Sequence, residues 1–154
     1  MTCRSVHIPH EVARSVALAL ALEPLGDKEG CTTRFIDSSP KAKLTFFIAA
    51  AINIQKSLFD LAEVWLRHER QPNSVFYYAA DAQAASLRNR KGSKVTFGQT
   101  LLLVPLISAQ MASELWGRGF KCTDGTLEQI RPVLIACSME DISDLEKFRS
   151  EERR

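Results

Sequence analysis

The sequence has 154 residues, of which 45% are apolar, and its 20 basic and 18 acidic side chains leave a net charge of +2. This length fits a single domain, residues 1–154, and the apolar content is sufficient to bury a core. The nearly balanced charge argues against a general nucleic-acid binder, in which a strong basic excess is expected.

Helical periodicity dominates the sequence, and the extended alternation that indicates strands is scarce. The first predicted helix covers residues 10–23, directly after Pro9, because its apolar side chains recur at helical spacing. Residues 24–39 are predicted to form a loop, since proline and glycine interrupt any helix there. Ser39 then caps a second predicted helix that begins at Pro40 and extends to about residue 70, with room for one break.

The second half of the chain repeats this pattern. An alanine-rich helix is predicted over residues 75–90, and Gly92 follows it as a C-terminal stop. The next predicted helix covers residues 96–116, although Pro105 removes one backbone hydrogen bond inside it and kinks it. An interior proline of this kind is tolerated in a bundle where the kink serves packing.

Two further helices complete the prediction. Residues 126–136 form a short helix, and a capping box at residues 138–141 begins the last one, whose charges alternate in sign. We therefore expect an all-α fold, a compact bundle of about five to seven helices with functional loops.

The cysteines and the apolar runs predict the compartment. None of the four cysteines forms a C-x-x-C pair or accompanies a histidine cluster, so neither a zinc site nor a disulfide framework is expected. Polar residues interrupt the N-terminus before any apolar stretch, which argues against a signal peptide. The longest apolar runs, residues 46–52 and 101–107, fall short of the roughly 20 residues that a membrane span needs. We expect a cytoplasmic protein that binds neither membrane nor nucleic acid.

The predicted loop between the first two helices gathers acids, bases and glycine. The residues of interest are Glu23, Lys28, Gly30, Arg34 and Asp37. The arginine fork and the lysine ammonium bind phosphate, so Lys28, Gly30 and Arg34 are candidate phosphate-binding residues. Glu23 and Asp37 are candidate catalytic residues and candidate magnesium ligands, because Mg²⁺ takes one or two carboxylates and a carboxylate can act as a general base. The alternative is a polar surface loop, since a quarter of all residues are charged.

A second segment, residues 92–98, is bracketed by glycines and leads into the apolar block at residues 101–106. A glycine-rich turn that opens a helix brings backbone N–H groups up to an anion. The candidate phosphate-binding residues here are Gly92, Ser93, Lys94 and Gly98. A helix that simply ends in basic residues and a glycine explains the segment up to Gly92 without any ligand. Together the two segments predict one polyphosphate site between two loops.

The same segments resemble motifs of the triphosphoribosyl-dephospho-CoA synthase family. Residues 23–30, Glu-Pro-Leu-Gly-Asp-Lys-Glu-Gly, resemble E-V-x-x-P-K-P-G, and residues 92–98 resemble G-[TV]-N-T-x-[LK]-G. Residues 127–134 and 138–141 resemble the family stretch V-R-x-V-L…T-x-E-D. The resemblance covers about residues 11–150, with the blocks in the family order. Both prolines of the first motif and the Asn-Thr pair of the second are replaced, as in a divergent or shortened member of the archaeal type.

The resemblance implies an ATP-dependent transferase. In that family the 2′-hydroxyl of dephospho-CoA attacks the ribose C1 of ATP, adenine leaves, and the triphosphoribosyl group is transferred. By the resemblance, the cations of the first loop hold phosphate, and one of its carboxylates acts as the base or as a Mg²⁺ ligand. The glycines of the second loop let the nucleotide approach closely, and Lys94 adds a phosphate contact that the family motif lacks.

Two alternatives remain open. One is a degenerate, non-catalytic helical protein of the same fold, which the loss of the Asn-Thr pair favours. The other is a partner-binding module that completes its site with another chain or with a second copy. In that case the apolar stretch at residues 101–107 forms an interface rather than core.

Overall fold

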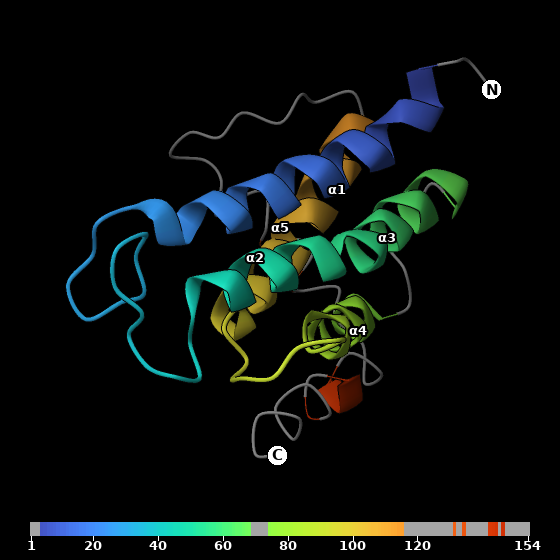
Figure 1. Cartoon of the computed structure of the whole chain (residues 1–154). Helices are drawn as coiled ribbons and strands as arrows, with labels where there is room; N and C mark the ends of the chain where they lie inside the picture. Colours follow the sequence, from blue (N-terminus) through green and yellow to red (C-terminus); the bar gives the residue numbers. More distant parts are fainter. Residues whose placement is uncertain are drawn as a thin grey trace.

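Helices account for all the regular structure of the residues that the structure describes (Figure 1). The computed structural model describes residues 4–68 and 74–115, together with residues 131, 134, 142–144 and 146. The elements are α1 (Arg4–Leu22), a short 3-10 helix (Glu23–Leu25), α2 (Leu44–Asn53), α3 (Gln55–His68), α4 (Phe76–Ser86) and α5 (Phe97–Leu115). The five α-helices pack into a bundle, which confirms the predicted all-α fold.

Helix α3 lies at the centre of the bundle. It packs against α1 on one side and α4 on the other, with α5 behind it in the view of Figure 1. Leu58, Leu61 and Trp65 recur at helical spacing along its buried face, and each is at most 1% exposed. They join Val12 of α1 and Met111 of α5 in one hydrophobic core. Burying each such large side chain contributes about 1.5–3 kcal/mol to the stability of the fold, so this stripe holds α3 against the neighbouring helices.

Helices α2 and α3 are nearly continuous. Only Ile54 separates them, and its N–H donates to Ala50 O over 3.1 Å while its own carbonyl accepts from Leu58 N over 3.2 Å. By length and composition the stretch Leu44–Arg67 could cross a membrane, but core helices pass the same test. The expected break in a long second helix is confirmed at Ile54.

The start of α2 differs from the prediction. Residues 40–42 form a turn, closed by the Ala42 N–H donating to Ser39 O over 3.0 Å, and the helix begins only at Leu44. The cap of this helix comes from Asp37, whose Oδ1 accepts the Leu44 N–H over 2.9 Å. The expected Ser39 cap was therefore wrong, because a carboxylate from earlier in the loop reaches the first turn.

The ends of α1 and α4 also differ from the prediction. Helix α1 begins at Arg4 rather than residue 10, and Pro9 lies buried within it. Helix α4 ends at Ser86 rather than residue 90: the N–H groups of Leu87 and Arg88 donate to the carbonyls three residues back, and Asn89 then adopts a left-handed conformation with φ of 55°. The α4–α5 loop therefore begins about one helical turn earlier than expected.

Helix α5 follows the prediction closely, and it includes Pro105 as a buried residue. The apolar stretch at residues 101–107 is mostly core: Val104 is fully buried and Ile107 is 2% exposed, whereas Leu102 is 73% exposed. The helices predicted over residues 126–136 and after the capping box at 138–141 lie outside the described residues, apart from isolated positions.

Candidate functional site

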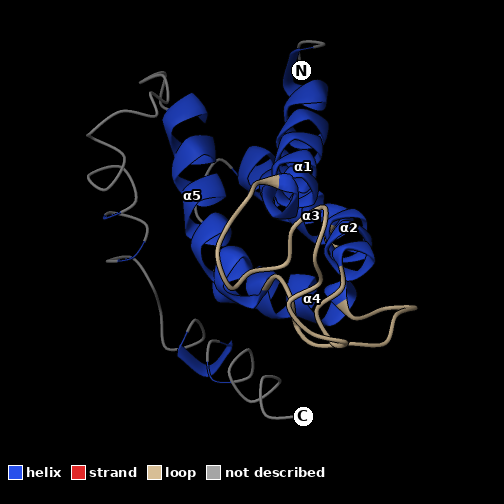
Figure 2. Ribbon diagram, turned by 60° about the vertical axis from the view of Figure 1, so that its left-hand side comes forward, coloured by secondary structure: helices blue, strands red, loops and turns tan. Residues whose placement is uncertain are grey.

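A cleft of about 780 Å³ opens between the loop that precedes α2 and the loop that joins α4 to α5. These loops lie at the same end of the bundle (Figure 2). The described lining residues are Pro40, Lys41, Phe46, Leu87, Lys91, Gly92, Ser93, Lys94 and Phe97. The second predicted segment therefore forms one wall of the cleft, and the turn before α2 forms the other.

The described lining of the cleft is basic. Lys41, Lys91 and Lys94 line it, and none of its described lining residues is acidic. Helix α5 begins at Phe97 on the cleft wall, so the partial positive charge of its first turn adds to that of the lysines. A cleft lined by one sign of charge focuses the field and concentrates counter-ions. This arrangement suits a phosphate or another multivalent anion.

Ser93 joins the two walls of the cleft. Its backbone N–H and its Oγ both donate to the carbonyl oxygen of Lys41, each over 2.8 Å. The two bonds use both lone pairs of that carbonyl. They connect positions 52 residues apart in the sequence, so they fix the backbone of Lys41 relative to the turn that carries Lys91 and Lys94.

Gly92 allows the same two loops to approach closely. Its φ of +134° lies in the region that favours glycine, and an added Cβ would lie 2.5 Å from Cδ2 of Phe46 and 2.9 Å from the carbonyl oxygen of Lys41. A side chain is therefore excluded both by the backbone conformation and by space. By the resemblance, Gly92 was expected to let a nucleotide approach closely, which stays a prediction; the neighbour that the structure shows is the ring of Phe46.

Arg90 holds the α4–α5 loop through hydrogen bonds to backbone carbonyls. Its Nη1 donates to Ser93 O over 2.8 Å, its Nε donates to Ser86 O at the end of α4, and Cζ lies 5.9 Å from the centre of the Phe46 ring. Burial lowers the pKa of this guanidinium. Nη2 is buried and makes no hydrogen bond within the described part of the chain. The sequence did not predict that Arg90 braces this loop, because its hydrogen bonds depend on how the chain turns after α4.

The first predicted segment, residues 23–37, does not line the cleft. None of its candidates, Glu23, Lys28, Gly30, Arg34 and Asp37, is among the described lining residues of the cleft. Glu23 and Lys28 form an ion pair with each other at the surface. The guanidinium of Arg34 lies 4.4 Å from the centre of the Phe35 ring. Gly30 occupies an exposed turn with φ of +71° and open space around it.

Among these candidates, Asp37 is the nearest in sequence to Lys41, which lines the cleft. Its carboxylate caps α2 through Leu44, and Lys41 of the cleft belongs to the same short connection. Gly98, in the first turn of α5, does not line the cleft, and a Cβ added to it would meet open space. No group of three or more potential metal ligands occurs among the described residues. Magnesium binding by Glu23 and Asp37 stays a prediction.

Lys41 was missed by sequence reasoning. It follows Pro40 in a short polar turn, and no local signal distinguishes it from the other lysines. Its place in the cleft depends on the bonds to Ser93, which are tertiary contacts. The aromatic walls, Phe46 and Phe97, were missed for the same reason.

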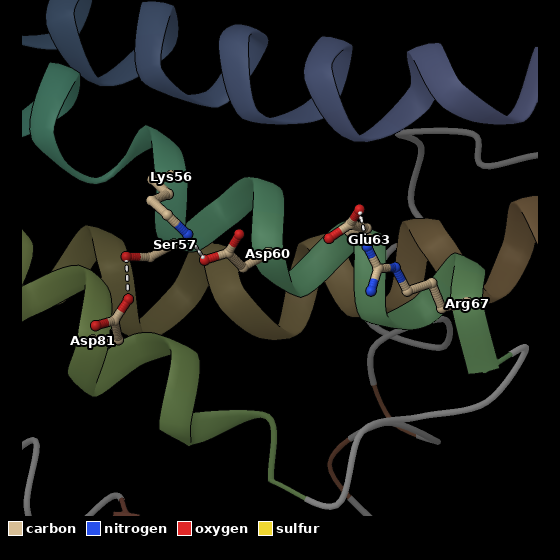
Figure 3. A network of polar contacts seen from close by, with 6 residues as sticks. All are labelled: Lys56, Ser57, Asp60, Glu63, Arg67 and Asp81. Carbon is tan, nitrogen blue, oxygen red and sulfur yellow. Dashed lines mark hydrogen bonds and ion pairs between the residues drawn. The ribbon is translucent and has the colours of Figure 1, made fainter.

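A polar network between α3 and α4 is a structural feature rather than part of the cleft (Figure 3). Ser57 Oγ donates to Asp81 Oδ2 over 2.5 Å and so joins the two helices. Lys56 pairs with Asp60, which raises the pKa of the lysine, and Glu63 pairs with Arg67. The pairs within α3 are spaced i, i+4, the usual pattern of a solvated helix face.

Comparisons with known proteins assign no relative to this chain. No protein-family model, no curated protein and no solved structure matches it. The transferase interpretation therefore rests on the motifs alone, and the basic cleft is a separate observation from the structure.

Proposed function

We propose that the cleft binds the phosphate groups of a nucleotide. The observation that supports this is the convergence of Lys41, Lys91 and Lys94 from two loops on one cleft of about 780 Å³, whose described lining includes no acidic residue. Lysine is a common phosphate binder that acts as a point charge. A cleft lined by cations attracts a polyanion through Coulomb interaction and concentrates it there.

The aromatic residues of the cleft favour a nucleotide over a simple anion. Phe46 and Phe97 line the same cavity as the lysines. Stacking of a base on an aromatic side chain contributes about 1–3 kcal/mol and tolerates any base. A cavity of this size also falls in the range of small-molecule sites.

The reaction that we propose for this site is the one that the resemblance implies, the transfer of the triphosphoribosyl group of ATP to a hydroxyl of a dephospho-CoA-like acceptor, with release of adenine. Asp37 is the better candidate for the general base, since it lies in the connection that carries Lys41, whereas Glu23 is paired with Lys28. In this proposal the lysines of the cleft hold the triphosphate while the acceptor hydroxyl attacks.

Calorimetric titration with ATP and Mg²⁺ tests the binding step. We expect saturable heat for the wild type, and we expect Lys91→Ala to weaken binding at least about tenfold, because a charge-assisted contact is lost. Lys43→Ala is the matched control, since Lys43 is exposed in the loop before α2 but does not line the cleft. No heat up to millimolar ATP, or equal losses for the two variants, would contradict the proposal.

An adenine-release assay tests the chemical step separately. Asp37→Asn keeps an oxygen that can accept the Leu44 N–H, so it preserves the cap of α2 while removing the base. We expect this variant to bind ATP and to lose turnover. If the wild type binds ATP but releases no adenine with dephospho-CoA present, the non-catalytic alternative is the better description.

A further inference from the structure

The two walls of the cleft meet at hydrogen bonds that occupy the backbone polar groups of Lys41 and Ser93. The Lys41 N–H donates to the hydroxyl of Ser39 over 3.3 Å, and the Lys41 carbonyl oxygen accepts both the N–H and the Oγ of Ser93. The carbonyl oxygen of Ser93 accepts the Val95 N–H over 3.0 Å and Nη1 of Arg90 over 2.8 Å. A carbonyl oxygen has two lone pairs, so both carbonyls are fully used. These groups are therefore committed to the protein itself and do not read the edge of a base.

Two exposed lysines supply charge to the same cleft. Lys41 and Lys91 line it from opposite loops, and both residues are exposed. An ammonium group attracts a phosphate as a point charge, and the strength of that attraction depends on the charge of the ligand rather than on the base that it carries. The lysines therefore recognise the phosphate chain of a nucleotide.

Phe46 supplies an aromatic surface beside these lysines. It is half-buried and lines the cleft, and two residues of the α4–α5 loop hold its ring in place. A Cβ on Gly92 would stand 2.5 Å from Cδ2 of the ring, and Cζ of Arg90 lies 5.9 Å from the ring centre. Every base presents a π-face, so stacking on an aromatic ring tolerates any base.

We infer that the cleft takes nucleoside triphosphates as a class, holding the phosphates by charge and the base by stacking on Phe46, without selecting the base. The inference rests on the proposed nucleotide site and specifies how that site recognises its ligand. A site built to hydrogen-bond a group of its ligand rejects an analogue that lacks this group by about 10⁴–10⁵-fold. ATP and GTP have ring systems of the same size but different donors and acceptors at the base edge, so their relative affinity measures base reading directly.

Calorimetric titration of the full chain with ATP and with GTP, at equal Mg²⁺, tests the inference. We expect the two dissociation constants to agree within about fivefold, because charge and stacking are nearly the same for both nucleotides. A larger difference in either direction overturns the inference, and the proposed function still stands as long as ATP binds. If neither nucleotide binds, the proposed function and the inference both fail.

Phe46→Leu separates stacking from charge. We expect this variant to bind ATP and GTP at least about fivefold more weakly and to bind inorganic tripolyphosphate as the wild type does, because only the nucleotides stack. An equal loss for tripolyphosphate, or no loss for the nucleotides, overturns the inference.

Phe59→Leu is the matched control for this variant. Phe59 is also half-buried, but its ring lies against His10, with ring centres 4.5 Å apart, and it is not among the described lining residues of the cleft. We expect wild-type affinity for all three ligands, and a loss equal to that of Phe46→Leu counts against the inference. Circular dichroism shows whether both variants keep their helices, and the comparison of ATP with GTP uses the wild type alone.

Discussion

Gly92 and Phe46 lie so close together that a Cβ on the glycine would stand 2.5 Å from the ring. The contact lets the α4–α5 loop rest on the first turns of α2, and it places Lys91 and Lys94 opposite Lys41. The positive φ of Gly92 makes the same contact inaccessible to other residues without strain. Gly92 thus permits the close approach of the two loops that line the cleft.

Gly92→Ala is expected to destabilise the protein by about 1–3 kcal/mol, since the backbone is strained and the Phe46 ring must move. Urea denaturation measures the change in the free energy of unfolding. Gly98→Ala is the paired control: the Cβ meets open space within α5, and the higher helix propensity of alanine is expected to stabilise by up to about 1 kcal/mol. A Gly92→Ala variant as stable as Gly98→Ala would contradict the close contact.

Arg90→Lys tests the brace behind the cleft. Lysine keeps the charge but loses the fork that spans Ser86 O and Ser93 O, so we expect a loss of about 1–3 kcal/mol in stability. We also expect faster hydrogen exchange at the amides of residues 91–95, which mass spectrometry can detect. Arg88→Lys is the control, because Arg88 is an exposed base in the same loop and does not line the cleft. Equal exchange in the two variants would show that Arg90 does not hold the loop.

The link between α3 and α4 is expected to matter more than the surface pairs beside it. Ser57→Ala removes a hydroxyl that is buried with its residue at 2% exposure, and it leaves Asp81 without that donor, so we expect a loss of about 1–3 kcal/mol. Lys56→Ala removes only an exposed i, i+4 pair with Asp60 and is expected to change stability little. Thermal denaturation of both variants distinguishes them, and the reverse order would contradict the assignment.

Tyr78 is expected to make stability fall at alkaline pH. Burial, followed by the charges of Tyr77, Asp60 and Asp81, raises the pKa of the Tyr78 phenol above its ordinary value of 10.0. Because the folded state binds this proton more tightly, its contribution is fully present below the unfolded pKa and is lost as pH rises through the folded pKa. Urea denaturation from neutral pH to about pH 11 should show a smaller decline for Tyr78→Phe than for the wild type. An identical decline would show that Tyr78 is not responsible.

Much of the fold could be predicted from the sequence, because its signals are local. The spacing of Leu58, Leu61 and Trp65 gives α3 its buried stripe, and the apolar run around Val104 identifies α5 as a core helix. The errors lie at helix ends. They arise where a side chain from another part of the loop supplies the cap, as Asp37 does, or where the N–H groups donate to carbonyls only three residues back, as at the end of α4.

The candidate site, likewise, could be predicted from the sequence only in part. Glycine and lysine in residues 92–98 indicated an anion site, and Gly92, Ser93 and Lys94 do line the cleft. Its opposite wall was expected from residues 23–37 and instead comes from Lys41 and Phe46. The sequence by itself determined the helices and one wall of the cleft, since periodicity and turn chemistry act over a few residues. Only the tertiary structure decided which loop faces that wall, because the bonds from Ser93 to Lys41 exist only once α2, α3 and α4 have packed together.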